Sequence, residues 1–269
     1  MVSLANKALV ITGASRGIGR EFAKIALKES AFVTVSARDT SKMAELFSDF
    51  PEDRVHIVAA DISHPDQAKQ LIDAAIHRWK RIDVLVNNAG VSMRGNFIDL
   101  QSDVVEKVFQ TNTFGTAYTT MYALPKIIKS EGSVIFVNTI SGVVGFPGSS
   151  IYSSSKMALS AIAQAIDAEL YQNSVHIGSV YLPYVTNDRE KVIIDSDGNE
   201  IHHQRKAKIS QYQAALLIRK SILRRKRRII FGFLGKFAWF INGVAPFIAD
   251  FILRTSRGSI HRITKSKTS

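Results

Sequence analysis

Short apolar runs alternate with longer amphipathic stretches along most of the chain. The runs are rich in β-branched residues and have the length of strands; they cover 7–12, 31–37, 54–61, 83–90, 133–139 and 176–183. The stretches between them have a helical period, over 18–30, 66–79, 102–129 and 152–172. Strands that are apolar on both faces and alternate with helices are typical of a parallel sheet covered on both sides. The pattern predicts an α/β fold with a doubly wound parallel sheet, which a short run at 227–232 would extend to about seven strands.

The length of 269 residues, 46% of them hydrophobic, is enough for one sizeable core, so we expect a single domain over 1–269. The polar stretch 185–210 is too long for an ordinary connection; we interpret it as a substrate lid, with a disordered insertion as the alternative. The chain has no cysteine, which excludes disulfides and thiolate sites. His202 and His203 lack a third ligand at metal spacing, so no metal site is expected.

The first fifteen residues contain no apolar run of signal-peptide length, so we expect a cytoplasmic protein. Positive charge is concentrated at the other end of the chain. Residues 201–269 hold 16 Lys/Arg against one acid, a net charge of +15, whereas the remaining residues hold 19 against 22, a net charge of −3. A partner for this charge is therefore expected near the C-terminus.

The C-terminal extension, 224–269, begins with five basic residues, Arg224 to Arg228, followed by an apolar stretch. That stretch, 229–253, is interrupted by Lys236, Asn242, Pro246 and Asp250, which argues against a simple spanning helix. One interpretation is peripheral attachment to an anionic membrane surface. The other is a last strand followed by helices packed on the core or on another subunit. Nucleic acid is not expected, because the arginines form one block outside any recognisable binding fold.

The first predicted strand runs through a glycine-rich turn, TGASRGIG, into a helix. Glycines let the backbone approach a diphosphate, and the helix N-terminus supplies unpaired N–H groups and a positive dipole end. The order strand, glycine turn, helix favours dinucleotide binding over a plain tight connection. The candidate contacts in this turn are Thr12, Gly13, Ser15, Arg16, Gly17, Ile18 and Gly19.

The end of the second strand bears on the choice of cofactor. An acid there would hold a ribose 2′-hydroxyl, whereas an arginine can pair with a 2′-phosphate. Ala37 occupies the strand end, Arg38 follows, and Arg16 can add a second positive charge. Asp39 argues the other way, unless Arg38 and Asp39 form an exposed turn. We predict NADP(H) rather than NAD(H), because a guanidinium–phosphate pair is strong and specific.

Among the eight hydroxyl residues of VNTISGVVGFPGSSIYSSSK, Tyr152 has a distinctive partner, since Lys156 lies four residues later on the same helical face. A neighbouring cation favours the phenolate, so the pair predicts a lowered pKa for Tyr152. The serines at 149, 150 and 153 to 155 are interpreted as turn and helix-start residues.

Together these residues resemble the short-chain dehydrogenase/reductase family, over residues 7 to about 186. The resemblance rests on TGASRGIG, Asp61-Ile62, the motif at 87–90, Asn112, and Tyr152 with Lys156, in the order and spacing of the family. It implies a Rossmann-type fold and a tetrad of Asn112, Thr139, Tyr152 and Lys156. It also implies further cofactor contacts at Asp61, Ile62, Asn88, Ala89, Gly90, Tyr152, Lys156, Pro183, Val185 and Thr186.

The chain departs from the family pattern at two places. The substrate-binding serine of the family stands thirteen residues before the tyrosine, where this chain has Thr139; Ser141 is the alternative, and spacing favours Thr139. After the sixth strand the family carries Pro-Gly, whereas here Tyr184 follows Pro183, which puts the shape of the substrate mouth in doubt.

The resemblance implies an NADP(H)-dependent oxidoreductase that interconverts a small apolar ketone or aldehyde, lipid-like ones included, and its alcohol. Residues 91–97, 142–150 and 184–210 would shape the pocket, and we expect a homodimer or homotetramer. The alternative is a non-catalytic, membrane-associated NADP-binding scaffold, against which the complete tetrad argues.

Overall fold

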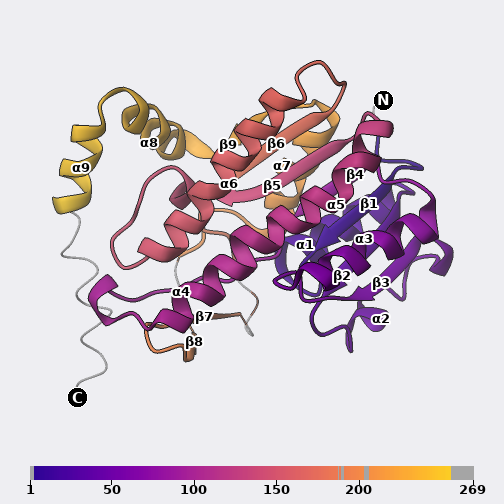
Figure 1. The fold of residues 1–269 in the computed structure, drawn as a ribbon, viewed down its shortest axis with the longest axis horizontal. Coiled ribbons are helices and arrows are strands. Elements are labelled where there is room, and N and C mark those ends of the chain that lie inside the picture. The colour runs from indigo at the N-terminus through magenta and orange to yellow at the C-terminus, as the bar shows by residue number, and fades with distance from the viewer. Residues whose placement is uncertain (1–2, 187, 189–190, 203–205, 256–269) are drawn as a thin grey trace.

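The computed structural model describes all residues except 1–2, 187, 189–190, 203–205 and 256–269. Its centre is a seven-stranded parallel sheet in the order β3-β2-β1-β4-β5-β6-β9 (Figure 1). The strands are β1 (Ala8–Thr12), β2 (Phe32–Ala37), β3 (Val55–Ala59), β4 (Val84–Asn87), β5 (Ser133–Thr139), β6 (His176–Leu182) and β9 (Arg228–Ile230). The predicted fold class and the seventh strand are confirmed.

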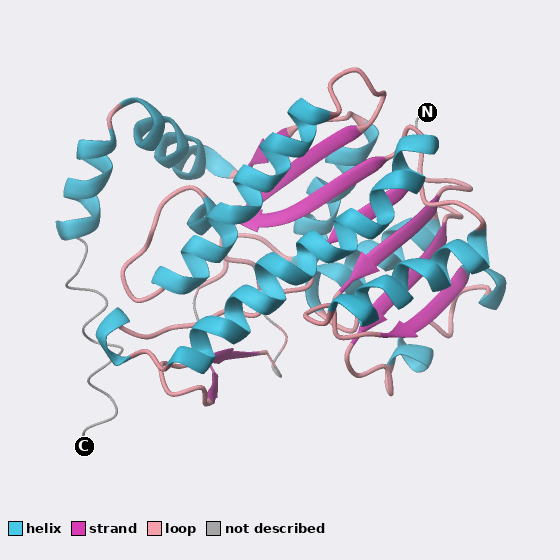
Figure 2. Cartoon of the chain, viewed as in Figure 1, coloured by secondary structure: helices cyan, strands magenta, loops and turns pink. Residues whose placement is uncertain are grey.

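Helices cover both faces of the sheet (Figure 2). They are α1 (Gly17–Lys28), α2 (Met43–Leu46), α3 (Pro65–Trp79), α4 (Ser102–Phe109), α5 (Gly115–Lys129), α6 (Ser150–Glu169), α7 (Gln211–Leu223), α8 (Gly232–Val244) and α9 (Pro246–Thr255). Alternate strand residues point to opposite faces. Leu9 and Ile11 share a core with α1 and α7, and Val10 shares the other core with α3, α5 and α6.

The helical period of 102–129 predicts one continuous α-helix, but the structure has two. Residues Gln110–Phe114 form a π-helical turn (η3) between α4 and α5. Such turns insert one extra residue into a helix and are frequent at functional sites. Asn112 lies inside this turn and is fully buried.

The order of the strands reverses between β1 and β4, which are neighbours in the sheet although β2 and β3 intervene in sequence. In parallel sheets, ligands bind outside the carboxyl ends of the strands at such a point. The glycine turn that follows β1 and the 88–90 segment that follows β4 both lie there.

Part of the predicted lid, 185–210, is a hairpin of β7 (Val192–Ile194) and β8 (Glu200–His202). Val185 and Ile209 pair at the base of this segment, so its described ends lie side by side. Six positions of this segment, 187, 189–190 and 203–205, are outside the described residues, and His203 is one of them.

Candidate active site

The glycine turn is packed directly against the segment that follows β4. A Cβ atom on Gly13 would lie 2.8 Å from the Cα atom of Ala89, so this position has no room for a side chain. The Oγ1 atom of Thr12 accepts hydrogen bonds from the N–H groups of Asn88 and Ala89, at 3.0 and 3.1 Å. The Nδ2 group of Asn88 donates back to the carbonyl of Gly13, at 2.9 Å. Thr12 and Asn88 thus hold the two loops together, and a direct contact of either residue with a cofactor stays a prediction.

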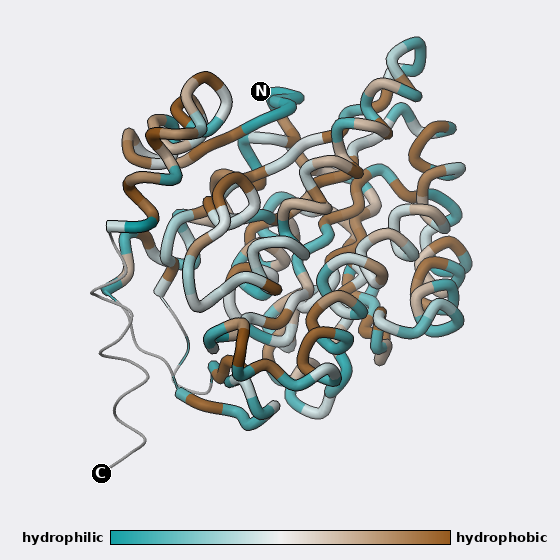
Figure 3. Tube along the Cα trace, turned by 60° about the vertical axis from the view of Figure 1, so that its left-hand side comes forward, coloured by the Kyte–Doolittle hydropathy of each residue, from teal (hydrophilic) through white to brown (hydrophobic). Residues whose placement is uncertain are grey.

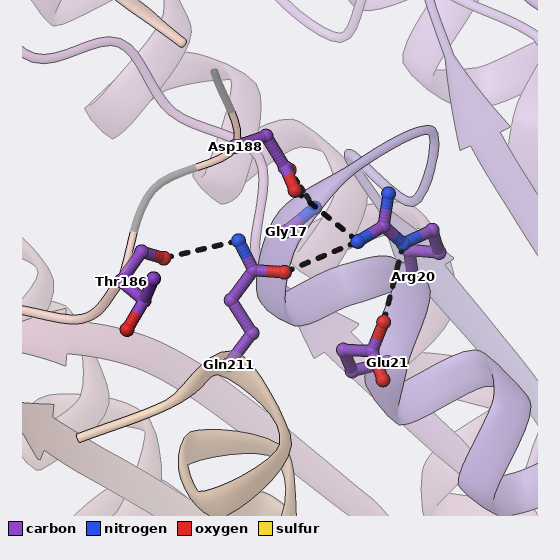
Figure 4. Close-up of polar contacts among 6 residues, drawn as sticks. All are labelled: Gly17, Arg20, Glu21, Thr186, Asp188 and Gln211. Carbon is purple, nitrogen blue, oxygen red and sulfur yellow. Dashed lines mark hydrogen bonds and ion pairs between the residues drawn. The ribbon is translucent and has the colours of Figure 1, made fainter. Parts of the chain in front are cut away.

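An acidic side chain from the lid segment lies at the N-terminus of α1 (Figure 4). The Oδ2 atom of Asp188 accepts a hydrogen bond from the N–H of Gly17 at 2.8 Å, and its Oδ1 atom pairs with Arg20 at 3.2 Å. Arg20 also donates to Gln211, whose Nε2 group donates to the carbonyl of Thr186 at 3.0 Å. Gly17 has a positive φ of 61°, a conformation that favours glycine.

The Asp188 carboxylate provides a test of whether an anion fits this turn. The N-terminus of a helix binds phosphate through unpaired N–H groups and the helix dipole, and a carboxylate is held there by the same forces. The structure therefore has an anion at the place where the diphosphate of a dinucleotide would lie. Sequence reasoning missed Asp188, because it lies in a segment without a recognisable pattern, 171 residues from Gly17.

The part of the site that is expected to bind the adenine ribose of the cofactor contains charges of both signs. Arg38 follows β2 and is exposed, and Asp39 accepts a hydrogen bond from the N–H of Ser41 at 2.8 Å. Burial raises the pKa of Asp61, but hydrogen bonds from Ser63 and the nearby charge of Arg38 outweigh it and lower the pKa overall. Asp39 therefore belongs to its own turn, whereas Arg38 lies close enough to Asp61 to act on it.

Lys156 and Asn112 meet at Gly90. A Cβ atom on Gly90 would lie 3.0 Å from the Oδ1 atom of Asn112 and 3.4 Å from the Nζ atom of Lys156. Asn112 is held by the backbone of Val91, through its Oδ1 atom at 2.8 Å and its Nδ2 group at 2.9 Å. The Nζ group of Lys156 donates to the carbonyl of Val137 at 3.2 Å. The structure thus brings together three of the residues that the sequence singles out.

Burial changes both members of the tyrosine–lysine pair. Desolvation, with the charge of Lys191 as a second cause, lowers the pKa of Lys156 to about 8. Desolvation raises the pKa of Tyr152 to about 12, although a hydrogen bond from Ser92 opposes it. The expectation that Lys156 lowers the pKa of Tyr152 is wrong, because desolvation dominates and the Nζ group of Lys156 donates to the Val137 carbonyl.

Thr139 ends β5, and its position is determined by the residue before it. Asn138 is buried; its Oδ1 atom accepts from the N–H of Thr139 at 2.8 Å, and its Nδ2 group donates to the carbonyl of Lys156 at 3.1 Å. One side chain therefore connects the end of β5 to the helix that carries Tyr152 and Lys156. Asn138 could have been found from the sequence, because it is a polar residue inside an otherwise apolar predicted strand. Ser141 lies in the next short turn, η4 (Ile140–Gly142), and donates its N–H to the Oγ1 atom of Thr139 at 3.5 Å.

The other predicted cofactor residues occupy different environments. Ile18 and Val185 pack against one core, and Ile62 is buried in the other. Ser15 is half-buried, Arg16 is exposed, and Pro183 follows β6 directly. Thr186 donates its hydroxyl to the carbonyl of Ile209 at 3.3 Å, so its contact with a cofactor stays a prediction.

The three stretches that the sequence assigns to the substrate pocket lie together. Met93 pairs with Ile194 of β7, and the N–H of Gly95 donates to the carbonyl of Gly148 at 3.1 Å. Arg94 hydrogen-bonds the hydroxyl of Tyr184. Tyr152 packs against a small apolar cluster at this place, which consists of Met93, Val104, Val108, Ile151 and Ile194.

The fold and this arrangement of residues define an oxidoreductase of the Rossmann type. A sequence model described as short chain dehydrogenase matches residues 7–197. A Staphylococcus aureus protein described as an uncharacterized oxidoreductase is 31% identical over 181 residues, which cover 67% of this chain and 78% of the other. The chain therefore belongs to the short-chain dehydrogenase/reductase family, whose members bind a nicotinamide dinucleotide.

Two further similarities extend over most of the chain. Dehydrogenase/reductase SDR family member 7B of Xenopus tropicalis is 26% identical over 258 residues, 91% of this chain and 84% of its own. The crystal structure of a short-chain dehydrogenase from Streptomyces avermitilis has a TM-score of 0.80 at 22% identity, covering 95% of this chain and 99% of the other. A Burkholderia phymatum member in complex with NAD has a TM-score of 0.76 at 23% identity, covering 85% and 90%.

Proposed function

We propose that the protein is an NADP(H)-dependent oxidoreductase that interconverts an apolar ketone or aldehyde and its alcohol. The observation that carries the proposal is the meeting of Asn112 and Lys156 at Gly90, with Tyr152 one helical turn before Lys156 and beside an apolar cluster. When bound, the cofactor supplies hydride chemistry, while the protein supplies orientation and electrostatics.

The side chains would act on the substrate oxygen and its proton. A pKa of about 12 keeps Tyr152 protonated near neutral pH, which is the form that donates a proton to the oxygen of a carbonyl under reduction. Thr139 would donate a second hydrogen bond to the same oxygen. Lys156 would hold the nicotinamide ribose, and Lys156 and Asn112 would support a relay of ordered water that returns a proton to Tyr152.

Residues at the other end of the site would hold the rest of the cofactor. The N-terminus of α1 would bind the diphosphate in place of Asp188, since both are anions. The preference for NADP(H) rests on Ala37 at the end of β2, on the engagement of Asp39 by Ser41, and on the two arginines, Arg16 and Arg38. NAD is the ligand of the Burkholderia phymatum relative, so a comparison of both cofactors belongs to the test.

The decisive experiment is a screen of ketones, aldehydes and alcohols with NADPH and NADP, followed by the Tyr152→Phe variant on any substrate found. Loss of turnover with retained NADPH binding is expected, because the variant lacks only the hydroxyl. Retained turnover would refute the mechanism. NADPH binding without turnover of any carbonyl or alcohol would instead favour the non-catalytic scaffold.

A second pair of variants decides between the two hydroxyl candidates. Thr139→Val keeps the shape of the side chain and removes its donor, so it should lower kcat by about a hundredfold or more. Ser141→Ala should leave kcat nearly unchanged. The reverse result would assign the substrate hydrogen bond to Ser141.

A further inference from the structure

The two C-terminal helices carry an unusual amount of exposed apolar surface. Figure 1 shows α8 and α9 projecting from one end of the molecule, and Figure 3 shows that hydrophobic residues predominate along them. Ten large apolar side chains are exposed here: Phe233, Leu234, Phe237, Trp239, Phe240, Val244, Phe247, Ile248, Phe251 and Ile252. Apolar patches of this density mark protein or membrane contacts. We call this surface the α8–α9 face.

The inner side of α8 is fixed to the body of the protein. A Cβ atom on Gly235 would lie 2.7 Å from the Cδ1 atom of Ile140, so the helix approaches η4 closely. At its other end, the Nδ2 group of Asn242 donates to the carbonyl of Val143 at 3.0 Å. Near its base, the Arg228 guanidinium lies 5.9 Å from the ring centre of Trp239. The α8–α9 face therefore belongs to an anchored element, and its residues Trp239, Phe240 and Val244 border a hollow that Gly142 and Val143 also line.

The five-residue basic cluster borders the α8–α9 face at one end, where the Arg228 guanidinium lies beside Trp239. Arg225 donates to the carbonyls of Glu131 and Ser174, which precede β5 and β6, whereas α8 packs near the ends of these strands. Arg225 therefore lies near the opposite end of these strands from α8.

The two helices themselves carry a small excess of positive charge. Lys236 and Arg254 are exposed on α8 and α9, and Asp250 is the one acid in the whole of 201–269. The sequence beyond α9 adds four basic residues and no acid. A partner that covers this region must therefore tolerate or attract positive charge.

Two partners fit an exposed apolar face, and charge distinguishes them. A second copy packed symmetrically would place the same patch against itself, so one contact would collect Lys236 and Arg254 of both copies with one acid per chain to compensate. An anionic bilayer compensates such charges and takes up aromatic side chains at its interface. Within the described part of the chain, every helix is too short or too polar to cross a bilayer.

We propose that the α8–α9 face docks the protein on an anionic membrane surface, with both helices lying in the plane of the interface. The helix that docks packs on η4, directly after Thr139. The contact would thus hold the active site next to the lipid phase. The proposal is independent of the proposed activity, because docking needs neither cofactor nor turnover.

The test is flotation of the full-length protein with vesicles of phosphatidylcholine and phosphatidylglycerol, and with phosphatidylcholine alone. Stronger binding to the anionic vesicles is expected, weakened by salt. Phe247→Ser with Phe251→Ser should weaken binding about tenfold or more at any salt concentration, since both side chains are highly exposed on one helical face. Lys236→Gln and Arg254→Gln should each weaken it about fivefold, at low salt only.

The matched control is Ile98→Ser, which removes a side chain that is 91% exposed elsewhere on the surface. It should leave vesicle binding unchanged, and circular dichroism and melting should show that all variants are folded. Wild-type protein that stays at the bottom of both gradients would overturn the proposal. So would a loss of oligomers in the Phe247 and Phe251 variant without any binding to vesicles, because the face would then be a subunit contact.

Discussion

Replacing Asp188 by asparagine should tighten the binding of NADPH. The Asp188 carboxylate lies at the N-terminus of α1, where the diphosphate is expected. The cofactor would have to displace this carboxylate. The free energy of the two contacts that Asp188 makes is therefore subtracted from the free energy of NADPH binding. Asparagine keeps the size of the side chain and removes the negative charge.

The magnitude follows from these contacts. The carboxylate accepts from the N–H of Gly17 at 2.8 Å and pairs with Arg20 at 3.2 Å, and about a quarter of its surface is exposed. A hydrogen bond to a charged group contributes about 1.5–3 kcal/mol, and partial exposure favours the lower end. A loss of about 1.5 kcal/mol should lower the Kd for NADPH about tenfold.

Isothermal titration calorimetry with two ligands distinguishes a change at the diphosphate position from a general change in nucleotide affinity. NADPH contains the diphosphate, whereas adenosine 2′-monophosphate does not, so the variant should bind the second ligand with unchanged affinity. Glu200→Gln is the matched control, since it removes an exposed acid from the same lid segment. Unchanged or weaker NADPH binding by a folded Asp188→Asn variant would refute the reasoning, because the carboxylate would then not compete with the diphosphate.

Three further variants test other parts of the site. Arg38→Ala should weaken NADPH binding about ten- to a hundredfold and NADH binding far less, and an equal loss for both would place the 2′-phosphate elsewhere. Lys156 has an ordinary pKa of 10.5 when unfolded and about 8 when folded, so the unfolded chain binds the extra proton between these values. The free energy of unfolding should therefore rise by up to about 1.4 kcal/mol per pH unit in this window, and Lys156→Met should remove that rise in urea titrations at several pH values. Asn138→Ala should lower the free energy of unfolding by about 2 kcal/mol, because its hydrogen bonds from β5 to Lys156 and Ser160 of α6 are lost, and unchanged stability would contradict that role.

Local patterns in the sequence determined the architecture and much of the candidate site. Apolar runs are the buried strands of a parallel sheet, so their positions are visible without the fold. The turn TGASRGIG and the spacing of Tyr152 and Lys156 are likewise local, and a helix places the latter pair on one face.

Tertiary structure decided what depends on groups far apart in the chain. The π-helical turn at Asn112 has no periodic signature, and the raised pKa of Tyr152 comes from desolvation by residues that other segments bring. The place of Asp188 at α1 depends on a long segment folding back over the sheet. The contacts of the cluster Arg224 to Arg228 likewise depend on the fold, since Arg225 bonds the carbonyl of Glu131 before β5 whereas Arg228 lies beside Trp239 of α8. Desolvation and long-range charge contacts depend on distances in space, which the order of residues alone does not contain.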